Sequence, residues 1–585
     1  MEYLVVKYKG NDCGVIIDDV TGDWVTNEVS WVSAGHHVVR LSMPAGSFTP
    51  AQIAVELNGT SPQHPKTIQF FQGMRRAGQM RGEGLAVLAA IALVGISCAP
   101  LNSKLPKDRY PTKSGDGPVA GVTGAPRNGY RFTNLAGGRD DNRLFVCLTF
   151  SGGGTRAAAL AYGAMIALRQ TKIKWPREET LLDEVDCISS VSGGSFTAAY
   201  YGLFGERLFQ DFEQKMLYRD IEGGLILKGM APWNWPWLWS PYYSRIDLAA
   251  DYYDDTIYEH KKYRALIEHG RRPFIILNAT NIGNESRFPF TQEQFDLLGS
   301  DLSDYSVARA VAASSAFPFL LCPLTLENYQ HLDGFTIPTV YQVARDDYYL
   351  NRSQYHWAQS EREYVDYPMP YVHLLDGGLA DNIGLRPVIN AYEQTNGFIM
   401  RDLPEIDRLV IISVNARSKG EDPTGNGRHT PYIIPTVALA TADTAMDNYS
   451  FDSVDLMNRL VDEIRQAEKE QQSAGIRSSV HAVPYAIEIS FEAIANKDRR
   501  REFYGIGTNF GLPAEQVRAL ISEGCELLKN DATFRCMLED LERDGRGTAT
   551  TESACNDLTV DHHPAAADGI VCPDGGGWPA ERVGS

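Results

Sequence analysis

The hydrophobic pattern from residue 141 to residue 545 alternates between apolar runs and amphipathic stretches. Residues 144–150 form a continuous apolar run, which is typical of a strand buried on both faces. We expect further strands of this domain at residues 187–191, 274–279, 371–375 and 408–414. Residues 452–471 carry apolar side chains at helical spacing, which predicts a surface helix with one buried stripe. Such alternation predicts an α/β fold with a mainly parallel sheet between helical layers.

The segments around this domain have other patterns. Residues 1–73 contain short alternating stretches separated by Gly, Asp, Asn and Pro, which predict a small β-rich module without a visible catalytic constellation. Residues 99–140 are rich in Pro, Gly, Lys and Asp, and we interpret them as a linker. Residues 546–585 are rich in Gly, Pro, Ala and Asp, which predicts a flexible tail.

Residues 74–98 have the layout of a secretory signal: three arginines, a short apolar run and a terminal Cys98. The segment resembles a bacterial lipoprotein signal whose Cys98 is lipidated. Its apolar part, residues 84–97, falls short of the ~20 residues that a membrane-spanning helix needs. Either translation starts at Met74 or Met80, or a cytosolic module is joined to an anchor. We expect a cell-envelope protein held at a membrane by Cys98 or by residues 84–97. The alternative for this segment is a buried core helix. The alternative location of the protein is the cytoplasm.

Charge and composition narrow the class of protein. Of the 585 residues, 55 are Lys or Arg and 74 are Asp or Glu, a formal net charge of −19, which argues against a nucleic-acid partner. No CxxC pair, Cys/His zinc-ligand set or calcium-binding loop of EF-hand spacing occurs, so we expect no metal. We also expect no cofactor. Export would permit disulfides among Cys525, Cys536, Cys555 and Cys572, but free thiols are the default expectation.

A glycine-rich turn follows the first strand of the domain. Gly152, Gly153 and Gly154 precede Thr155 and Arg156, and a strong helix former comes next. This order places several backbone amides in a concave turn at a helix N-terminus, where an anion is stabilised. The turn could hold a phosphate or the oxyanion of a reaction. Neither the P-loop nor the dinucleotide glycine pattern is present in the sequence.

A second strand-to-helix turn carries a serine. The strand at residues 187–191 runs into Ser192, and Gly193 and Gly194 open the following helix. This is the layout of a nucleophile elbow, in which a sharp turn raises the serine hydroxyl above the sheet. Ser190 stands where the usual pattern has its first glycine, and a small residue still fits there. The alternative interpretation is an ordinary Ser/Gly-rich turn between a strand and a helix.

A carboxylate follows another strand of the domain. Asp376 ends the apolar run at residues 371–375, and Gly377 and Gly378 turn the chain away from it. We expect the carboxylate to project at the C-terminal edge of the sheet, where open α/β sheets place their sites.

Histidines could complete a Ser-His-Asp triad instead. His373 lies three residues before Asp376 on the same strand and should therefore point to the opposite face. His331 and Asp333 are rivals for the role of base, and we interpret them as polar residues of an insertion before that strand.

Three motifs in this order resemble the patatin-like phospholipase family over about residues 141–530. Residues 308–318, Ala-Arg-Ala-Val-Ala-Ala-Ser-Ser-Ala-Phe-Pro, match a further segment that recurs in that family. The resemblance implies a three-layer α/β/α sandwich with a Ser–Asp dyad. It makes Ser192 the nucleophile, Asp376 the base and residues 152–156 the oxyanion loop, with the amides of residues 153–155 as donors. Ser151 and Ala157 depart from the family's usual Asp and Gly.

The resemblance implies a serine acyl hydrolase that cleaves esters of phospholipids or other lipids through an acyl-enzyme. Its partners would be a lipid substrate and a membrane surface. The main alternative is a catalytically inactive envelope lipoprotein that uses the same fold for binding or scaffolding. A third hypothesis keeps the enzyme and changes the acyl donor to a lysophospholipid, a neutral glyceride or a protein-bound acyl group.

An aromatic segment lies between the serine and the carboxylate. Its aromatic residues alternate with prolines, which rule out a long regular helix: Trp233, Trp235, Trp237, Trp239, Tyr242 and Tyr243. Such side chains favour the membrane–water boundary, so the segment could be a lid or an interfacial loop that presents lipid to the serine. The alternative is a loop that packs these aromatic side chains on the core.

Overall fold

The structure of the protein is a computed structural model. It describes residues 3–8, 11–16, 29–32, 36–39, 129–135, 143–240, 242–318, 320–329, 359–360, 363–364, 369–393, 406–419, 434–473, 482–546, 553, 555, 562–576 and 578. The chain divides into two compact units, Met1–Ile96 and Ser97–Ser585. The expected signal segment with Cys98 lies outside the described residues, and so do His331 and Asp333.

The first unit contains a four-stranded sheet in the order β1-β2-β4-β3. Its strands are β1 (Tyr3–Tyr8), β2 (Asn11–Ile16), β3 (Val29–Val32) and β4 (His36–Val39). β1 pairs antiparallel with β2, and β2 pairs parallel with β4. The β-rich module predicted from the sequence therefore contains a sheet within residues 3–39, and the rest of residues 1–73 lies outside the described residues.

The second unit is built on a mixed sheet in the order β11-β12-β9-β8-β5-β13-β14, with β10 added beside β9. The strands that form this sheet are β5 (Leu144–Phe150), β8 (Val185–Val191), β9 (Phe274–Asn281), β10 (Ser286–Pro289), β11 (Leu324–Glu327), β12 (Tyr371–Asp376), β13 (Arg408–Asn415) and β14 (Val483–Ser490). The five strands from β9 to β14 are parallel neighbours. β5, β8, β9 and β13 are buried along their whole length, as their apolar sequences predict.

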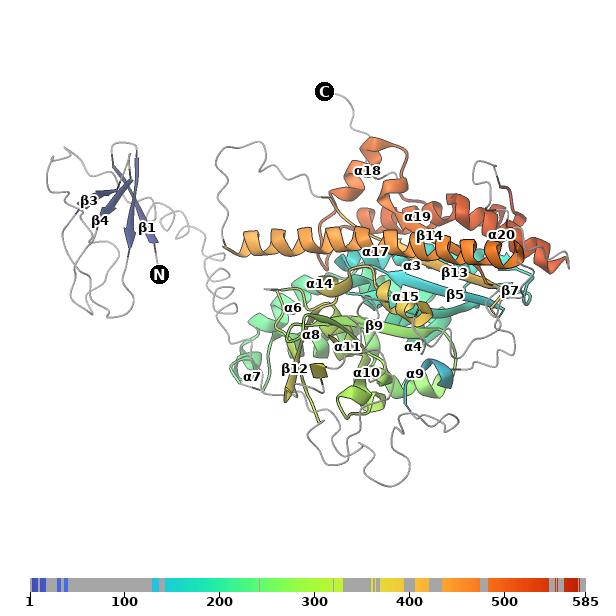
Figure 1. Ribbon diagram of the computed structural model, residues 1–585. Helices are drawn as coiled ribbons and strands as arrows, with labels where there is room; N and C mark the ends of the chain where they lie inside the picture. Colours follow the sequence, from blue (N-terminus) through green and yellow to red (C-terminus); the bar gives the residue numbers. More distant parts are fainter. Residues whose placement is uncertain are drawn as a thin grey trace, which may run out of the picture. The chain divides into compact units, whose positions relative to one another are not determined.

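Helices cover both faces of this sheet (Figure 1). One layer holds helices that pack on one another: α3 (Gly154–Gln170), α4 (Gly193–Phe204), α8 (Arg245–Tyr253), α9 (Tyr263–His269), α11 (Val307–Ser314), α19 (Ala514–Asn530) and α20 (Ala532–Gly545). The other layer holds α17 (Ile434–Ser473), which packs on β14. It lies on the opposite face because the connection from β13 to β14 crosses the sheet in the opposite direction to the connection from β5 to β8. The three-layer α/β/α fold predicted from the sequence is confirmed.

Shorter helices complete the domain. They are α5 (Leu208–Phe212), α6 (Ile221–Met230), α7 (Trp235–Leu238), α10 (Gln292–Leu297), α14 (Gly378–Asp381), α15 (Arg386–Glu393), α18 (Lys497–Tyr504) and α21 (Ala565–Asp568). Throughout the described part of the chain, no helix has both the length and the apolar character needed to cross a membrane. α17 includes the helix expected at residues 452–471 and begins well before it.

β12, the strand that carries Asp376, runs antiparallel to β9. From the sequence we expected Asp376 at the C-terminal edge of the sheet, on a strand parallel to its neighbours. In the structure Asp376 pairs with Ala279, next to Asn278, which pairs with Val191 at the end of β8. Asp376 therefore reaches the end of β8 from the opposite direction, because β12 starts beyond that edge and runs back toward the middle of the sheet.

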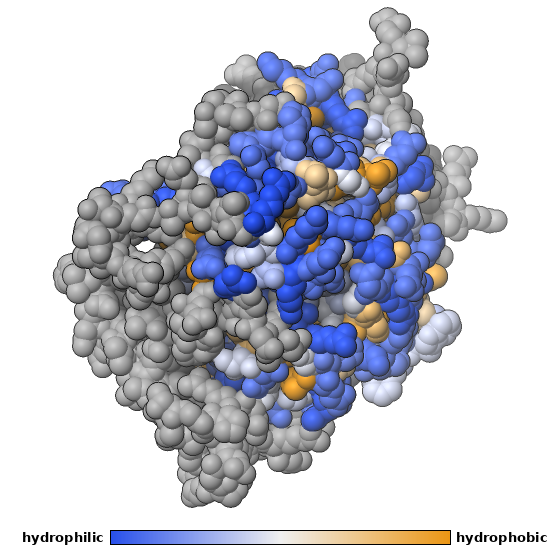
Figure 2. Space-filling view, turned by 90° about the vertical axis from the view of Figure 1, so that its right-hand side faces the viewer, coloured by the Kyte–Doolittle hydropathy of each residue, from blue (hydrophilic) through white to orange (hydrophobic). Residues whose placement is uncertain are grey.

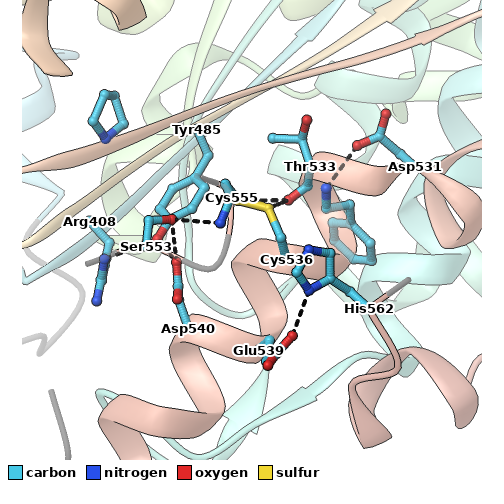
Figure 3. The surroundings of a disulfide bond; sticks show 12 residues. Arg408, Tyr485, Asp531, Thr533, Cys536, Glu539, Asp540, Ser553, Cys555 and His562 are labelled. Atoms are coloured by element: carbon cyan, nitrogen blue, oxygen red, sulfur yellow. Dashed lines mark hydrogen bonds and ion pairs between the residues drawn. A yellow bond between two sulfur atoms is a disulfide. The ribbon is translucent and has the colours of Figure 1, made fainter. Parts of the chain in front are cut away.

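The C-terminal segment differs from the expected flexible tail in the part that the structure describes. Disulfides join Cys572 to Cys525 on α19 and Cys555 to Cys536 on α20. Near the second disulfide, the Ser553 hydroxyl donates to Asp540 Oδ2 at 2.6 Å, and the same oxygen accepts the Tyr485 hydroxyl (Figure 3). These covalent and polar anchors explain why a composition poor in apolar residues failed to predict this packing. The expectation of free thiols is therefore corrected for these four cysteines. A third disulfide, Cys147–Cys187, joins β5 to β8.

α3 and α19 approach each other closely at two glycines. A Cβ on Gly524 would lie 2.2 Å from the carbonyl oxygen of Leu160, and one on Gly163 would lie 2.1 Å from that of Ile521. The backbones of the two helices therefore touch where any larger residue would separate them. This contact positions the helix that begins at the glycine-rich turn.

We predict that Gly524→Ala destabilises the protein. In an isolated helix this change would stabilise by about 1 kcal/mol, but here the added methyl meets a rigid carbonyl, so we expect a net loss of about 1–3 kcal/mol. The measurement is urea unfolding with the disulfides intact. Gly569→Ala is the control, because its Cβ would meet no atom of the described residues nearer than 3.7 Å. A Gly524→Ala protein more stable than the parent would contradict the close contact.

Candidate active site

Ser192 occupies a strained turn between β8 and α4. Its backbone has φ 50° and ψ −119°, in the left-handed region that side chains other than glycine rarely adopt. The turn follows a fully buried strand, and the side chain is only 5% exposed. This is the geometry of a nucleophile elbow, because the sharp turn directs the hydroxyl away from the sheet and into the site.

The glycines after Ser192 let the elbow touch the glycine-rich turn. A Cβ on Gly193 would lie 2.0 Å from the carbonyl oxygen of Gly154, so only glycine fits there. The amide of Gly194 donates to the carbonyl oxygen of Ser151 at 3.2 Å. Ser190 lies on the strand side of the elbow, where its hydroxyl accepts that of Ser195 at 3.1 Å. Two motifs from separate strands therefore form one continuous surface around Ser192.

Ser192 and Asp376 are in direct contact. The Ser192 hydroxyl donates to Asp376 Oδ2 at 2.8 Å, and the amide of Gly378 donates to Oδ1 at 2.8 Å. Asp376 is 3% exposed, and its burial raises its pKa to about 6, while the bonds from Gly378 and Ser192 act in the opposite direction. The carboxyl is thus a stronger base than an exposed aspartate. The structure brings together the two side chains that the sequence singled out.

The turn at the end of α11 holds both residues of this pair. The Ser314 hydroxyl accepts the amide of Ser192 at 2.9 Å and donates to the carbonyl oxygen of Asn278 at 2.6 Å. The carbonyl oxygen of Ala316 accepts the amide of Asp376 at 3.0 Å, and that of Ser314 accepts the amide of Gly377. Sequence reasoning gave no role to Ser314. The only signal for it was its place in the segment at residues 308–318.

The glycine-rich turn offers fewer free donors than expected. The amide of Gly152 donates to the carbonyl oxygen of Asn382 at 2.9 Å, and that of Thr155 donates to Asn509 at 2.9 Å. Within the described residues, no hydrogen bond uses the amides of Gly153 and Gly154. The expected set of donors is therefore reduced to these two glycines, because Gly152 and Thr155 already hold the turn in place.

Arg156 is a support of the turn rather than part of its opening. Its buried guanidinium donates to the carbonyl oxygens of Ala416 and Ile506 and to the hydroxyl of Thr508 at 3.1 Å. The resemblance placed Arg156 with the oxyanion loop, and the structure corrects this for its side chain. The long side chain reaches back because three acceptors lie on the segments packed against α3.

Residues from three other parts of the chain complete the supports. Asn382, from the turn after Asp376, and Asn509 accept the amides described above. The Ser151 hydroxyl accepts the amide of Ala416 at 2.8 Å. Asn382 stood inside the motif that begins at Asp376, but nothing in the sequence pointed to Asn509, because its role depends on tertiary packing alone.

The rival base His373 lies on the other face of β12. Its Nδ1 is 3.0 Å from the hydroxyl of Thr325 on β11, and alternate residues of β12 are buried and exposed, with Asp376 on the buried face. No group of three or more His, Cys, Asp or Glu side chains that could hold a metal ion occurs among the described residues. A buried carboxylate can accept the proton of Ser192 beside the amides of Gly153 and Gly154, which take part in no hydrogen bond among the described residues.

Comparison with known proteins agrees with the motifs. Residues 148–389 match the family model described as Patatin-like phospholipase, so the resemblance predicted from the sequence is confirmed for this region. No curated protein sequence matches the chain.

Solved structures similar to the chain include human GIVD cytosolic phospholipase A2, with 14% identity and a TM-score of 0.28 over 52% of this chain. The match covers 51% of that phospholipase, so the chain spans about half its length. VipD from Legionella pneumophila is similar with 10% identity and a TM-score of 0.21, over 74% of this chain and 92% of VipD.

We predict that ester hydrolysis depends on pH through Asp376. The carboxyl must be ionised to accept a proton, and its pKa is about 6, so kcat/KM should rise as pH increases through about 6 and then level off. The measurement is the pH profile with a soluble nitrophenyl ester. Asp531, whose pKa is also raised to about 6, caps α20, and Asp531→Asn should leave the midpoint unchanged. A midpoint near 4 would contradict the raised pKa of Asp376, and a midpoint that moves in Asp531→Asn would contradict the assignment of the titration to Asp376.

We predict that Ser314→Ala lowers kcat by about tenfold to a hundredfold and leaves KM within about twofold. The change removes the acceptor for the Ser192 amide, so the nucleophile loses its fixed position although substrate contacts persist. Ser315→Ala is the matched control, because the Ser315 hydroxyl donates to carbonyl oxygens of its own helix. Equal kcat values for the two variants would contradict a positioning role for Ser314.

Proposed function

We propose that the patatin-like phospholipase domain of this chain is a serine acyl hydrolase that cleaves ester bonds of lipids through Ser192 and Asp376. The observation that carries the proposal is the buried hydrogen bond between Ser192 Oγ and Asp376 Oδ2. Beside it lie the amides of Gly153 and Gly154, for which the described part of the chain offers no other partner. The family match at residues 148–389 supports lipid ester hydrolysis in general.

The first half of the reaction forms an acyl-enzyme. Ser192 Oγ attacks the carbonyl carbon of the ester while Asp376 accepts the hydroxyl proton. The amides of Gly153 and Gly154 stabilise the oxyanion of the tetrahedral intermediate, and removal of one such donor typically costs about 3–4 kcal/mol of barrier. When the intermediate collapses, the bond to the leaving alcohol breaks and the alcohol oxygen takes the proton from Asp376. The alcohol leaves, and the acyl group stays on Ser192.

The second half returns the enzyme to its starting state. A water molecule attacks the acyl carbonyl and gives a proton to Asp376, which is again ionised after the first product has left. The same amides hold the second oxyanion. Collapse breaks the bond to Ser192 Oγ, which recovers its proton from Asp376, and a fatty acid is released. One carboxylate suffices for both halves because its raised pKa lets it take and give the proton near neutral pH.

We also propose that the protein works in the cell envelope. The disulfides Cys525–Cys572 and Cys536–Cys555 support this location, because such bonds persist in oxidising compartments outside the cytosol. The basic and apolar sequence before Cys98 supports it independently. In this proposal Cys98 or residues 84–97 hold the enzyme at a membrane.

Loss of Ser192 or Asp376 should abolish hydrolysis. We expect Ser192→Ala and Asp376→Asn each to lower kcat/KM for a nitrophenyl ester at least about 10³-fold, since both groups act in every step. A mass increase equal to one acyl group, found on the parent protein and absent from Ser192→Ala, would identify the acyl-enzyme.

His373→Ala is the control and should keep full activity, because His373 lies on the opposite face of β12 from Asp376. Full activity in Asp376→Asn would remove Asp376 from the mechanism. A parent protein that hydrolyses neither the nitrophenyl ester nor phospholipid would favour the inactive binding protein instead.

A further inference from the structure

An exposed apolar surface lies on α6, α7, the turn between them and the residues that follow α7 up to Tyr242. We call it the aromatic surface, and its side chains are Ile226, Leu227, Met230, Trp233, Trp235, Trp237, Trp239 and Tyr242. Leu227, Trp233 and Trp239 are 73%, 75% and 68% exposed, which is unusual for such large apolar groups so close together in the chain. The alternative that these aromatic side chains pack on the core is therefore contradicted.

The charge of this segment is opposite to that of the whole chain. The 21 residues from 223 to 243 contain no Asp or Glu and one Lys, whereas the chain has a net charge of −19. Lys228 pairs with Asp255 on the neighbouring segment at 3.3 Å. A segment that has no carboxylate of its own, and whose lysine is paired with the nearby Asp255, can approach lipid phosphates with little repulsion, although the chain as a whole is not attracted to anionic lipid.

The described residues at the right-hand side of Figure 1 form a different kind of face. Figure 2 shows that face with mostly hydrophilic residues and small, separate apolar patches. The aromatic surface is therefore not a general property of the protein's exterior.

The aromatic surface is joined to the candidate active site through the first turn of α6. The Asp220 carboxylate caps this helix by accepting the amide of Gly223 at 2.8 Å, and the amide of Ile221 donates to the carbonyl oxygen of Phe510. The residue before Phe510 is Asn509, which accepts the amide of Thr155 in the glycine-rich turn. Two hydrogen-bonded links therefore separate the aromatic surface from the oxyanion loop.

A second connection runs through α8. Gly224 on α6 packs closely on the phenol of Tyr252, since a Cβ there would lie 2.3 Å from the Tyr252 hydroxyl oxygen. On the same helix, the Asp247 carboxylate accepts Arg309 of α11 at 2.8 Å, and α11 carries Ser314. The aromatic surface is thus connected both to the oxyanion loop and to α11, which carries Ser314.

We propose that the aromatic surface docks on the headgroup region of a zwitterionic lipid bilayer and brings Ser192 to its substrate. The proposal rests on the proposed lipid hydrolase function. Trp and Tyr have an apolar ring and a polar atom that prefer the boundary between acyl chains and water, and Ile and Leu bury apolar area in the bilayer. The segment's lack of carboxylates fits a surface of phosphate-bearing headgroups. Because the attraction is mainly apolar, docking should depend little on salt.

The test measures binding of the full chain to vesicles of phosphatidylcholine by sedimentation. Every protein carries Ser192→Ala, so that no lipid is hydrolysed. Every protein also carries Leu88→Asp and Cys98→Ser, which remove both anchors proposed above, the apolar run at residues 84–97 and the lipidated cysteine. The surface variant adds Trp233→Ala, Trp237→Ala and Trp239→Ala. The control variant adds Phe451→Ala and Val571→Ala, two side chains that are 69% and 74% exposed elsewhere.

We expect the parent and the control to bind alike at about 0.1 M and about 0.5 M NaCl, and the surface variant to bind at least about tenfold more weakly. Equal binding of the surface variant would overturn the proposal. Parent binding that occurs only with anionic vesicles and is lost at about 0.5 M NaCl would also overturn the proposal. A parent that dimerises without lipid, and a surface variant that does not, would assign the surface to a second copy of the chain. Leu227→Asp is a second variant in case the triple change disturbs folding.

Hydrolysis of a soluble nitrophenyl ester separates this proposal from the proposed function. With Ser192 restored, the surface variant should hydrolyse the soluble ester like the parent and lose activity on vesicles. If the parent binds vesicles but has no esterase activity, the docking proposal stands and the proposed hydrolase function is rejected. If the parent has esterase activity and all variants bind vesicles equally, the proposed hydrolase function stands and the docking proposal is rejected.

Discussion

The hydrogen bond from Ser192 to Asp376 joins residues 184 positions apart and depends on how the strands meet at one edge of the sheet. β8 delivers the serine and the antiparallel β12 delivers the carboxylate. Main-chain amides on both sides donate to the short turn from Ser314 to Ala316, so a single turn fixes the separation of the two groups. The site therefore takes its precision from regular elements and from one supporting turn, rather than from the long connections around it.

Holding this pair in place opposes stability in two ways. A serine with positive φ costs about 1–3 kcal/mol of backbone strain, and a buried carboxylate resists ionisation. Because the pKa of Asp376 is raised above 3.8, the folded protein holds this proton more strongly than the unfolded chain does. The resulting stabilisation is complete below the unfolded pKa and is lost as pH rises through about 6. The working, ionised form is thus the less stable one, and the buried sheet offsets its cost.

The sequence predicted those features that local order determines. A strand, a small-residue turn and a helix identified Ser192, and an apolar strand ending in Asp-Gly-Gly identified Asp376. The antiparallel direction of β12 left no local signal, because a buried strand reads the same in either direction. The side chain of Arg156 and the amide of Thr155 were misjudged for a related reason. Their partners, Ile506 and Asn509, lie about 350 residues further on, and only tertiary packing brings them near.

The separation of these supports along the chain affects when the site is complete during synthesis. The elbow and the carboxylate have both been synthesised once residue 380 has been made, but Ala416, Ile506 and Asn509 have not. A nascent chain stopped at that point has a nucleophile and no fixed oxyanion loop. Because Ile506 and Asn509 lie in the last fifth of the 585 residues, the lipids of the cell that makes the protein can meet a competent enzyme only when translation is nearly complete.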